Sequence, residues 1–283
     1  MKDEFGGYYF KAQSREKALA VIAAYHRSKG EESCSVQLIS DDGVWSASYP
    51  AGAYHKTRKG FRLRLGDNKF TERGMELNID REGLKVSGRL RFGSFTPIRY
   101  DIMGPFCAVP FMECRHTVVS MKHRVDGCIT INGERYEFRN GVGYIEGDRG
   151  RSFPKVYSWT QCCFEGGSVM LSVADIPIGP VSFTGIIGVV MLGETEHRIA
   201  TYLGARPVGI KGGKITVRQG KTTLTAQLIE KRARPLAAPV LGSMERTIHE
   251  SASCRARYKL VRDGEVLLDI ESGNASFEYE YPD

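Results

Sequence analysis

Hydrophobic and polar residues alternate with a period of two along much of this chain, and tight-turn signals separate the alternating stretches. Asn-Gly and Asp-Gly pairs, which supply the positive φ angles of hairpin turns, occur at Asp42-Gly43, Asn132-Gly133 and Asp263-Gly264. Between turn signals of this kind lie alternating or β-branched runs, among them Leu84–Phe92, Cys128–Ile131, Glu134–Phe138, Ser168–Val173, Lys214–Val217, Thr222–Ile229 and Val266–Ile270. Strands at this spacing predict an antiparallel sandwich or barrel, and long strands around a cavity favour a barrel.

The length of 283 residues suits two domains better than one core. A stretch rich in turn formers, residues 93–115, contains Pro97, Gly104, Pro105 and Pro110. It is the best candidate for a linker or crossover. We therefore expect two domains, residues 1–115 and residues 116–283.

Residues 144–161 concentrate aromatic, acidic and amide side chains and include Trp159, one of two tryptophans. After Pro154 the period-two pattern places four side chains on one strand face: Tyr157, Trp159, Gln161 and Cys163. Large aromatics beside an amide suit the wall of a ligand cavity. The alternative is a core strand whose tryptophan has a hydrogen-bond partner.

This segment resembles the signature of the tocopherol cyclase-like family, Tyr-x-Glu-Lys-x-Trp-Gly-x-x-Phe-Pro-x-x-Trp-x-Trp-x-Gln. The matching residues are Tyr144, Glu146, Gly150, Phe153, Pro154, Trp159 and Gln161. Gly147, Arg149 and Tyr157 stand where the pattern has Lys, Trp and Trp. The loss of two tryptophans predicts a less aromatic pocket, suited to a more polar or shorter ligand.

Other segments resemble the same family in the same order. Phe5–Lys11 resembles its opening Phe-Glu-Gly-Trp-Tyr-Phe-Lys, and Asn132–Phe138 resembles its Gly-Gly-Glu-Arg-Phe-Glu-Phe hairpin. Leu236–Leu268 resembles its final long strands. The resemblance implies an all-β protein of two antiparallel lipocalin-like barrels side by side, with little helix. It also implies that the signature belongs to the second barrel.

One segment gives conflicting signals. The run Ala18–Ala24 has high helix propensity, and Ser14 could cap such a helix. The resemblance instead places the second strand of the first barrel there. We expect a strand, because tertiary context often overrides propensity.

The resemblance implies a cyclase of the isomerase class. In that reaction a protein acid protonates the alkene of a prenylated phenol or quinol, and the phenol oxygen captures the cation. Glu146 and Asp148 are the candidate acids, because such a reaction needs a carboxylic acid kept protonated by burial. The alternative for Glu146 is a loop carboxylate paired with Arg149, Arg151 or backbone amides. The candidate ligand-binding residues are Tyr144, Phe153, Tyr157, Trp159 and Gln161.

Composition excludes some classes of function. The six histidines are dispersed and no Cys-x-x-Cys pair occurs, so we expect no metal and no cofactor. The formal charge of +7 comes from Lys and Arg scattered among acids, which argues against nucleic-acid binding. A weakly basic surface is compatible with peripheral contact with an anionic membrane. Seven cysteines and an N-terminus without a signal-type apolar stretch predict free thiols in a cytoplasmic protein.

Three functions remain open at this point. The first is acid-catalysed cyclisation of an isoprenoid-type amphiphile in a barrel cavity. The second is non-catalytic carriage of a hydrophobic or amphipathic small molecule, and the third is a structural or interaction protein with a filled barrel. The fold does not decide among them.

Overall fold

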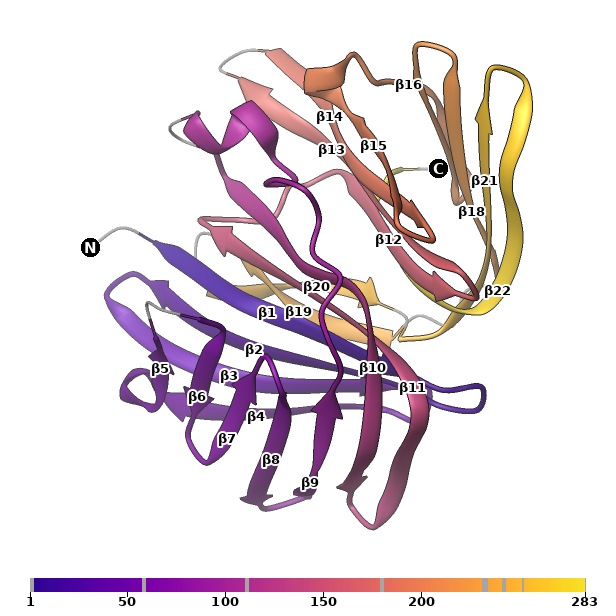
Figure 1. Ribbon diagram of the computed structural model, residues 1–283. Coiled ribbons are helices and arrows are strands. Elements are labelled where there is room, and N and C mark those ends of the chain that lie inside the picture. The colour runs from indigo at the N-terminus through magenta and orange to yellow at the C-terminus, as the bar shows by residue number, and fades with distance from the viewer. Residues whose placement is uncertain are drawn as a thin grey trace. The chain divides into compact units, whose positions relative to one another are not determined.

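The computed structural model describes residues 3–57, 60–109, 112–178, 181–230, 234–240, 243–250 and 252–282. These residues form strands and three short 3-10 turns, η1 (Ala51–Ala53), η2 (Gly104–Ala108) and η3 (Thr201–Leu203), and they contain no α-helix. The all-β class is confirmed (Figure 1). A search of the same residues for a helix long and apolar enough to cross a membrane finds none.

The chain divides into two compact units, neither of which is one continuous stretch. Unit 1 comprises residues 1–97, 113–153 and 237–247, and unit 2 comprises residues 98–112, 154–236 and 248–283. A two-stranded sheet of β19 (Arg234–Val240) and β20 (Ser243–Glu250) has residues in both.

Unit 1 is built on an antiparallel sheet of eleven strands in the order β4-β3-β2-β1-β11-β10-β9-β8-β7-β6-β5. Many neighbours are joined by short turns, as Figure 1 shows for the run from β6 to β9. Their bounds are β1 (Glu4–Gln13), β2 (Ala18–Ser28), β3 (Glu31–Ser40), β4 (Val44–Pro50), β5 (Tyr54–Lys56), β6 (Arg62–Leu65), β7 (Asn68–Thr71), β8 (Gly74–Arg81), β9 (Leu84–Phe92), β10 (Cys114–Ile131) and β11 (Glu134–Gly150). One apolar cluster, including Phe10, Leu77 and Ile145, fills the inner face of this sheet.

Unit 2 is built on a sheet of nine strands in the order β15-β14-β13-β12-β22-β21-β18-β17-β16. Gln219 links strands near the two ends of the sheet, because its side chain accepts from the Ala200 amide and donates to the Arg198 carbonyl. The bounds are β12 (Tyr157–Phe164), β13 (Gly167–Ile178), β14 (Val181–Leu192), β15 (Thr195–Ala200), β16 (Arg206–Lys211), β17 (Lys214–Gln219), β18 (Thr222–Glu230), β21 (Cys254–Arg262) and β22 (Glu265–Tyr279). The inner face carries a second apolar cluster, which includes Cys162, Tyr258 and Phe277.

The alanine-rich run forms the strand β2, as expected against its helix propensity. β2 pairs along its length with β1 and β3. Leu19, Val21 and Ala23 join the apolar cluster, while Ala20 and Ala24 are buried on the opposite face. Hydrogen bonding on both edges and burial on both faces outweigh the preference of alanine for helix.

The division at residue 115 needs correction. β10 and β11, expected in the second barrel, continue the first sheet, because β10 pairs with β9 and β11 pairs with β1. The crossing segment within residues 93–115 instead belongs in part to unit 2, from residue 98 to residue 112. A single cut in the sequence cannot describe units whose strands pair across such long separations.

Candidate acid–base site

Three of the expected site residues lie on one face of β11. Tyr144, Glu146 and Asp148 alternate with Ile145, which is part of the apolar cluster, so the three face away from that cluster. Tyr144 is 0% exposed and Glu146 is 5% exposed. Glu146 is therefore buried, as a candidate acid should be, on the face of the sheet opposite the apolar cluster.

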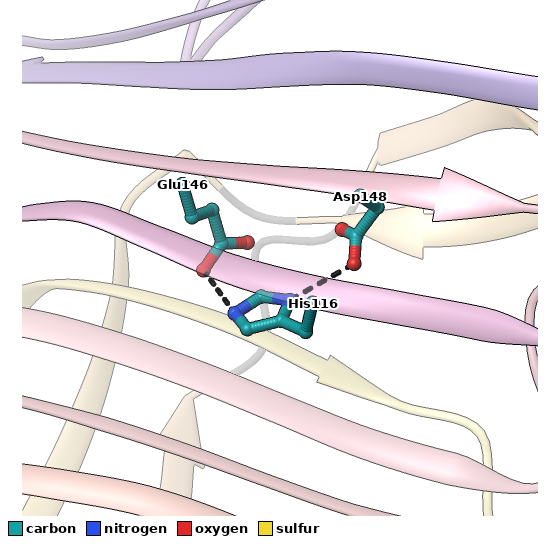
Figure 2. A group of neighbouring side chains, drawn as sticks. All are labelled: His116, Glu146 and Asp148. Carbon is teal, nitrogen blue, oxygen red and sulfur yellow. Dashed lines mark hydrogen bonds and ion pairs between the residues drawn. The ribbon is translucent and has the colours of Figure 1, made fainter. Parts of the chain in front are cut away.

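A histidine from the neighbouring strand completes the group. His116 of β10 pairs in register with Asp148, and Val118 pairs with Glu146. The His116 ring lies between the two carboxylates (Figure 2). Its Nδ1 is 2.9 Å from Asp148 Oδ1, and its Nε2 is 3.1 Å from Glu146 Oε2. The Nδ1 contact is a hydrogen bond, whereas the Nε2 contact is an ion pair without hydrogen-bond alignment.

Two further side chains bind the carboxylates. The Tyr144 hydroxyl donates to Glu146 Oε2 at 2.5 Å. The Cys114 thiol donates to Asp148 Oδ1 at 3.5 Å. Burial, reinforced by the Asp148 charge, raises the pKa of Cys114 well above its usual range, so this thiol stays protonated. The resulting chain runs from Cys114 through Asp148, His116 and Glu146 to Tyr144.

The electrostatics of the group favour a charged imidazole. Burial alone lowers the pKa of His116, but the carboxylates of Glu146 and Asp148 outweigh it and raise that pKa well above 6.5. His116 is therefore an imidazolium at neutral pH, held between two acids. The side chains of His116 and Glu146 are 10% and 6% exposed, while that of Asp148 is 24% exposed.

Register shifts in β10 place His116 in this position. A hairpin of uniform register continued from the Ile131–Glu134 pair would set His116 opposite Arg149, whose side chain points to the other face. Three shifts between Val118 and Gly127 change the register by one residue in sum, so that His116 stands opposite Asp148. Bulges commonly re-aim side chains in this way.

The same three residues offer donor atoms within 4.8 Å of one another, which is compact enough for a metal ion. However, the two ring nitrogens of His116 face different carboxylates, and one ion can bind only one of those nitrogens. An ion on Nε2 would therefore be shared with Glu146 alone, while Asp148 holds Nδ1 from outside, which leaves only two ligands from this group. The observed geometry fits a shared proton better than a shared cation.

The remaining expected residues divide between the units. Phe153 lies in unit 1, where its ring packs edge-on against Phe5 with centroids 5.2 Å apart. Tyr157, Trp159 and Gln161 lie on β12 of unit 2. This corrects the expectation that one barrel carries the whole signature.

In unit 2 these residues share one buried face of β12 with Cys163. Cys162, between them in sequence, joins the apolar cluster, so the four face away from it. The Tyr157 hydroxyl donates to Glu278 Oε2, and Gln161 Nε2 donates to Cys163 Sγ at 3.1 Å. Glu278, which stands opposite Trp159 in β22, is an acid that the sequence analysis did not identify.

His116 was not among the predicted site residues, because the six dispersed histidines were considered only as metal ligands. Counting outward from the Asn132-Gly133 turn would have brought His116 within one residue of Asp148. The hairpin turn therefore predicts that His116 lies near Asp148, but a uniform register places it one residue away, opposite Arg149. Glu146 lies within a strand and not a loop, and its partners include His116 and Tyr144.

Comparisons with known proteins identify the fold of this chain but do not assign it to a family. No family model matches the chain. A probable chloroplastic tocopherol cyclase of Oryza sativa subsp. japonica is 34% identical over 86 residues, which cover 29% of this chain and 18% of that protein. The match therefore spans less than a fifth of the rice protein.

Solved structures match over nearly the whole chain at low identity. CghA in complex with Sch210972 matches with a TM-score of 0.62 at 10% identity, covering 99% of this chain and 89% of that one. Kievitone hydratase from Nectria haematococca matches with a TM-score of 0.56 at 8% identity, with the same coverages. An AttH-type protein of Nitrosomonas europaea matches with a TM-score of 0.55 at 12% identity, covering 99% and 93%. These likenesses show a shared lipocalin-like fold.

Proposed function

We propose that this chain is a cofactor-independent enzyme of the cyclase or hydratase type, which adds an oxygen nucleophile across the alkene of an amphipathic, isoprenoid-type molecule. The finer form of the proposal is ring closure of a prenylated phenol or quinol. The observation that carries it is the buried Asp148–His116–Glu146–Tyr144 chain, which holds a proton between two acids. The partial match to a tocopherol cyclase and the fold shared with a hydratase support the reaction class.

The proposed proton donor is Glu146 in its acid form, and His116 holds the proton that it uses. An imidazolium whose pKa is raised is a weak acid, whereas a carboxylic acid is intrinsically stronger. In the proposed step, a small rotation aligns the 3.1 Å contact between His116 Nε2 and Glu146 Oε2 into a hydrogen bond, and transfer of the proton along it produces this stronger acid. Asp148 then holds the neutral imidazole through Nδ1.

The proposed reaction balances without any added reactant. Glu146 gives its proton to the less substituted alkene carbon, which leaves a tertiary cation. The phenol oxygen forms a bond to the cation, and the phenol proton returns to the Glu146 carboxylate. The Tyr144 hydroxyl, already bonded to Oε2, stabilises that carboxylate between the two transfers.

Replacement of the acid tests the proposal. Wild-type protein is incubated with a prenylated hydroquinone bearing a trisubstituted alkene, and products are separated by mass. Cyclisation gives an isomer of the substrate, whereas hydration adds one water. Glu146→Gln preserves shape and removes the acid, so we expect the rate to fall by roughly 10²–10⁴ while binding persists.

The matched control is Glu137→Gln, which changes an exposed glutamate on the same strand and should leave the rate unchanged. Full activity in Glu146→Gln would contradict the assignment of the acid. Tight binding by wild-type protein without any conversion would establish the carrier function in place of the enzyme.

A further inference from the structure

The outer face of one half of the unit 2 sheet is strongly basic. Its strands are neighbours in the order β22-β21-β18-β17-β16 (Figure 1). On β17, Ile215 and Val217 belong to the apolar cluster, so the residues that alternate with them point outward. The register extends this outward face over the neighbouring strands. The cations on this surface, which we call the basic face, are Arg206, Lys211, Lys214, Arg218, Arg255, Arg257 and Lys259.

The basic face carries fewer acids than cations. The acids that it carries in the described part of the chain are Glu230, Asp269 and Glu271. Asp269 pairs with Arg257 at 2.8 Å and with Lys259 at 3.4 Å, which offsets part of the charge on β21. β16 and β17 contain no acidic residue. The positive charge of the face is therefore concentrated on these two strands.

Two pairs of like charges stand directly opposite each other on β16 and β17. Lys211 pairs in register with Lys214, and Arg206 pairs with Arg218. Like charges directly opposite on neighbouring strands destabilise a sheet. Lysine on an edge strand such as β16 helps to prevent pairing with other chains, but this does not explain the cations opposite it on β17. An anionic partner outside the protein would relieve the repulsion in both pairs.

The shape and the exposed apolar side chains of these strands indicate the kind of partner. An open depression of about 220 Å³ is lined by Lys214, Thr225, Gln227, Arg257 and Lys259. Val208 of β16, Ile229 of β18 and Val266 of β22 are 61%, 41% and 51% exposed. Aliphatic side chains beside cations suit the boundary between lipid headgroups and acyl chains. β16, β17 and β18 contain no aromatic residue on which the bases of a nucleic acid could stack.

We propose that the basic face docks on a membrane surface that contains anionic lipids. The phosphate headgroups lie against the cations of β16, β17 and β21, and the exposed aliphatic side chains reach toward the acyl chains. Each Lys or Arg close to an anionic membrane surface strengthens binding by roughly fivefold. The face belongs to unit 2, whereas the acid–base site lies in unit 1, and the proposal does not depend on the proposed reaction.

Flotation with lipid vesicles tests the docking surface. Wild-type protein should float with vesicles of phosphatidylcholine and phosphatidylglycerol but not with phosphatidylcholine alone, and high salt should release it, because salt screens exposed charges. The variant Lys214→Glu with Arg218→Glu removes two cations. Each new acid stands opposite Lys211 or Arg206, so the strands should pair at least as well as in wild type. Its affinity for the anionic vesicles should be weaker by roughly 30-fold or more.

The matched control is Arg62→Glu with Arg64→Glu, at exposed positions of β6 in unit 1, which changes the net charge by the same amount. Arg64 resembles Arg218, because each stands opposite a cation and donates to a glycine carbonyl two residues further on. The control should keep most of the wild-type affinity. Equal losses in the two double variants, or equal flotation of wild type with neutral and anionic vesicles, would overturn the proposal.

Acetylation of lysines, measured by mass spectrometry, locates the contact in wild-type protein and decides the matter even if a variant does not fold. Anionic vesicles should shield Lys211 and Lys214 but not Lys69 and Lys85, which are exposed in unit 1. Shielding of the unit 1 lysines alone, or of no lysine, would overturn the proposal. So would tighter binding to duplex DNA than to the vesicles, or release by inorganic phosphate beyond that by chloride at equal ionic strength.

Discussion

Replacement of His116 by glutamine should destabilise unit 1 by an amount that the geometry allows us to work out. The change leaves the carboxylates of Glu146 and Asp148 without their shared cation. Removal of one partner from a buried ion pair costs about 3–5 kcal/mol in free energy of unfolding. We expect about 3 kcal/mol, the lower end, because the Asp148 side chain keeps 24% of its surface in solvent.

The two tryptophans allow the units to be followed separately. Trp45 lies in β4 of unit 1 and Trp159 lies in β12 of unit 2. In a Trp159→Phe background, fluorescence during urea unfolding reports on unit 1 alone. At a slope of about 1–3 kcal/mol per molar urea, the midpoint for His116→Gln should fall by about 1–3 M. The exposed His55→Gln should leave it unchanged.

The pH dependence has a definite sign. The pKa of His116 is raised on folding, so its stabilising contribution is fully present below about pH 6.5 and is lost as pH rises through the raised pKa. The gap between wild type and His116→Gln should therefore be widest just below pH 6.5 and shrink as pH rises from there. A gap that widens with pH, or a midpoint equal to that of His55→Gln, would refute the reasoning.

Three further predictions concern stability and thiol chemistry. Arg198→Ala should lower the free energy of unfolding by about 3 kcal/mol and speed proteolysis within residues 98–112, because the buried Arg198 pairs with Glu196 and donates to the carbonyls of Tyr100 and Asp101. The control is Arg206→Ala, at an exposed arginine, and equal cleavage of the two variants would contradict the prediction. Gly88→Ala should destabilise the protein by about 1–3 kcal/mol in urea unfolding, because Gly88 has a φ of +137° and a Cβ would strike the Cys128 carbonyl. Gly52→Ala meets open space and should be neutral, and equal unfolding midpoints for the two variants would count against the prediction. Thiol titration of denatured, unreduced protein should find all seven cysteines, and a single reactive group would reveal disulfides absent from the structure.

Local signals in the sequence predicted the strands well. The Asn132-Gly133 pair marks the turn between β10 and β11, and Leu84–Phe92 coincides with β9. These features depend on turn chemistry and on alternation, which a single segment displays by itself. The strand character of β2 is the exception, because it depends on neighbours and required the family resemblance.

The site depended on information that single segments do not contain. The register shifts in β10 decide whether His116 faces Asp148; Asp126-Gly127 marks one of them, but no turn residue marks the two between Val118 and His123. Glu278 meets Tyr157 only because β22 pairs with β12, far apart in the chain. The unit boundary was misplaced for the same reason, because pairing of β1 with β11 is long-range.

The central claim is that the chain of Asp148, His116, Glu146 and Tyr144 delivers a proton to an alkene. The most direct measurement is turnover of a prenylated hydroquinone in deuterium oxide by wild-type protein and by Glu146→Gln. The account predicts a cyclic or hydrated product from wild type with one deuterium on the former alkene carbon that bears no oxygen, and little or no product from Glu146→Gln. Product without deuterium at that carbon, or equal turnover by the two proteins, would contradict it.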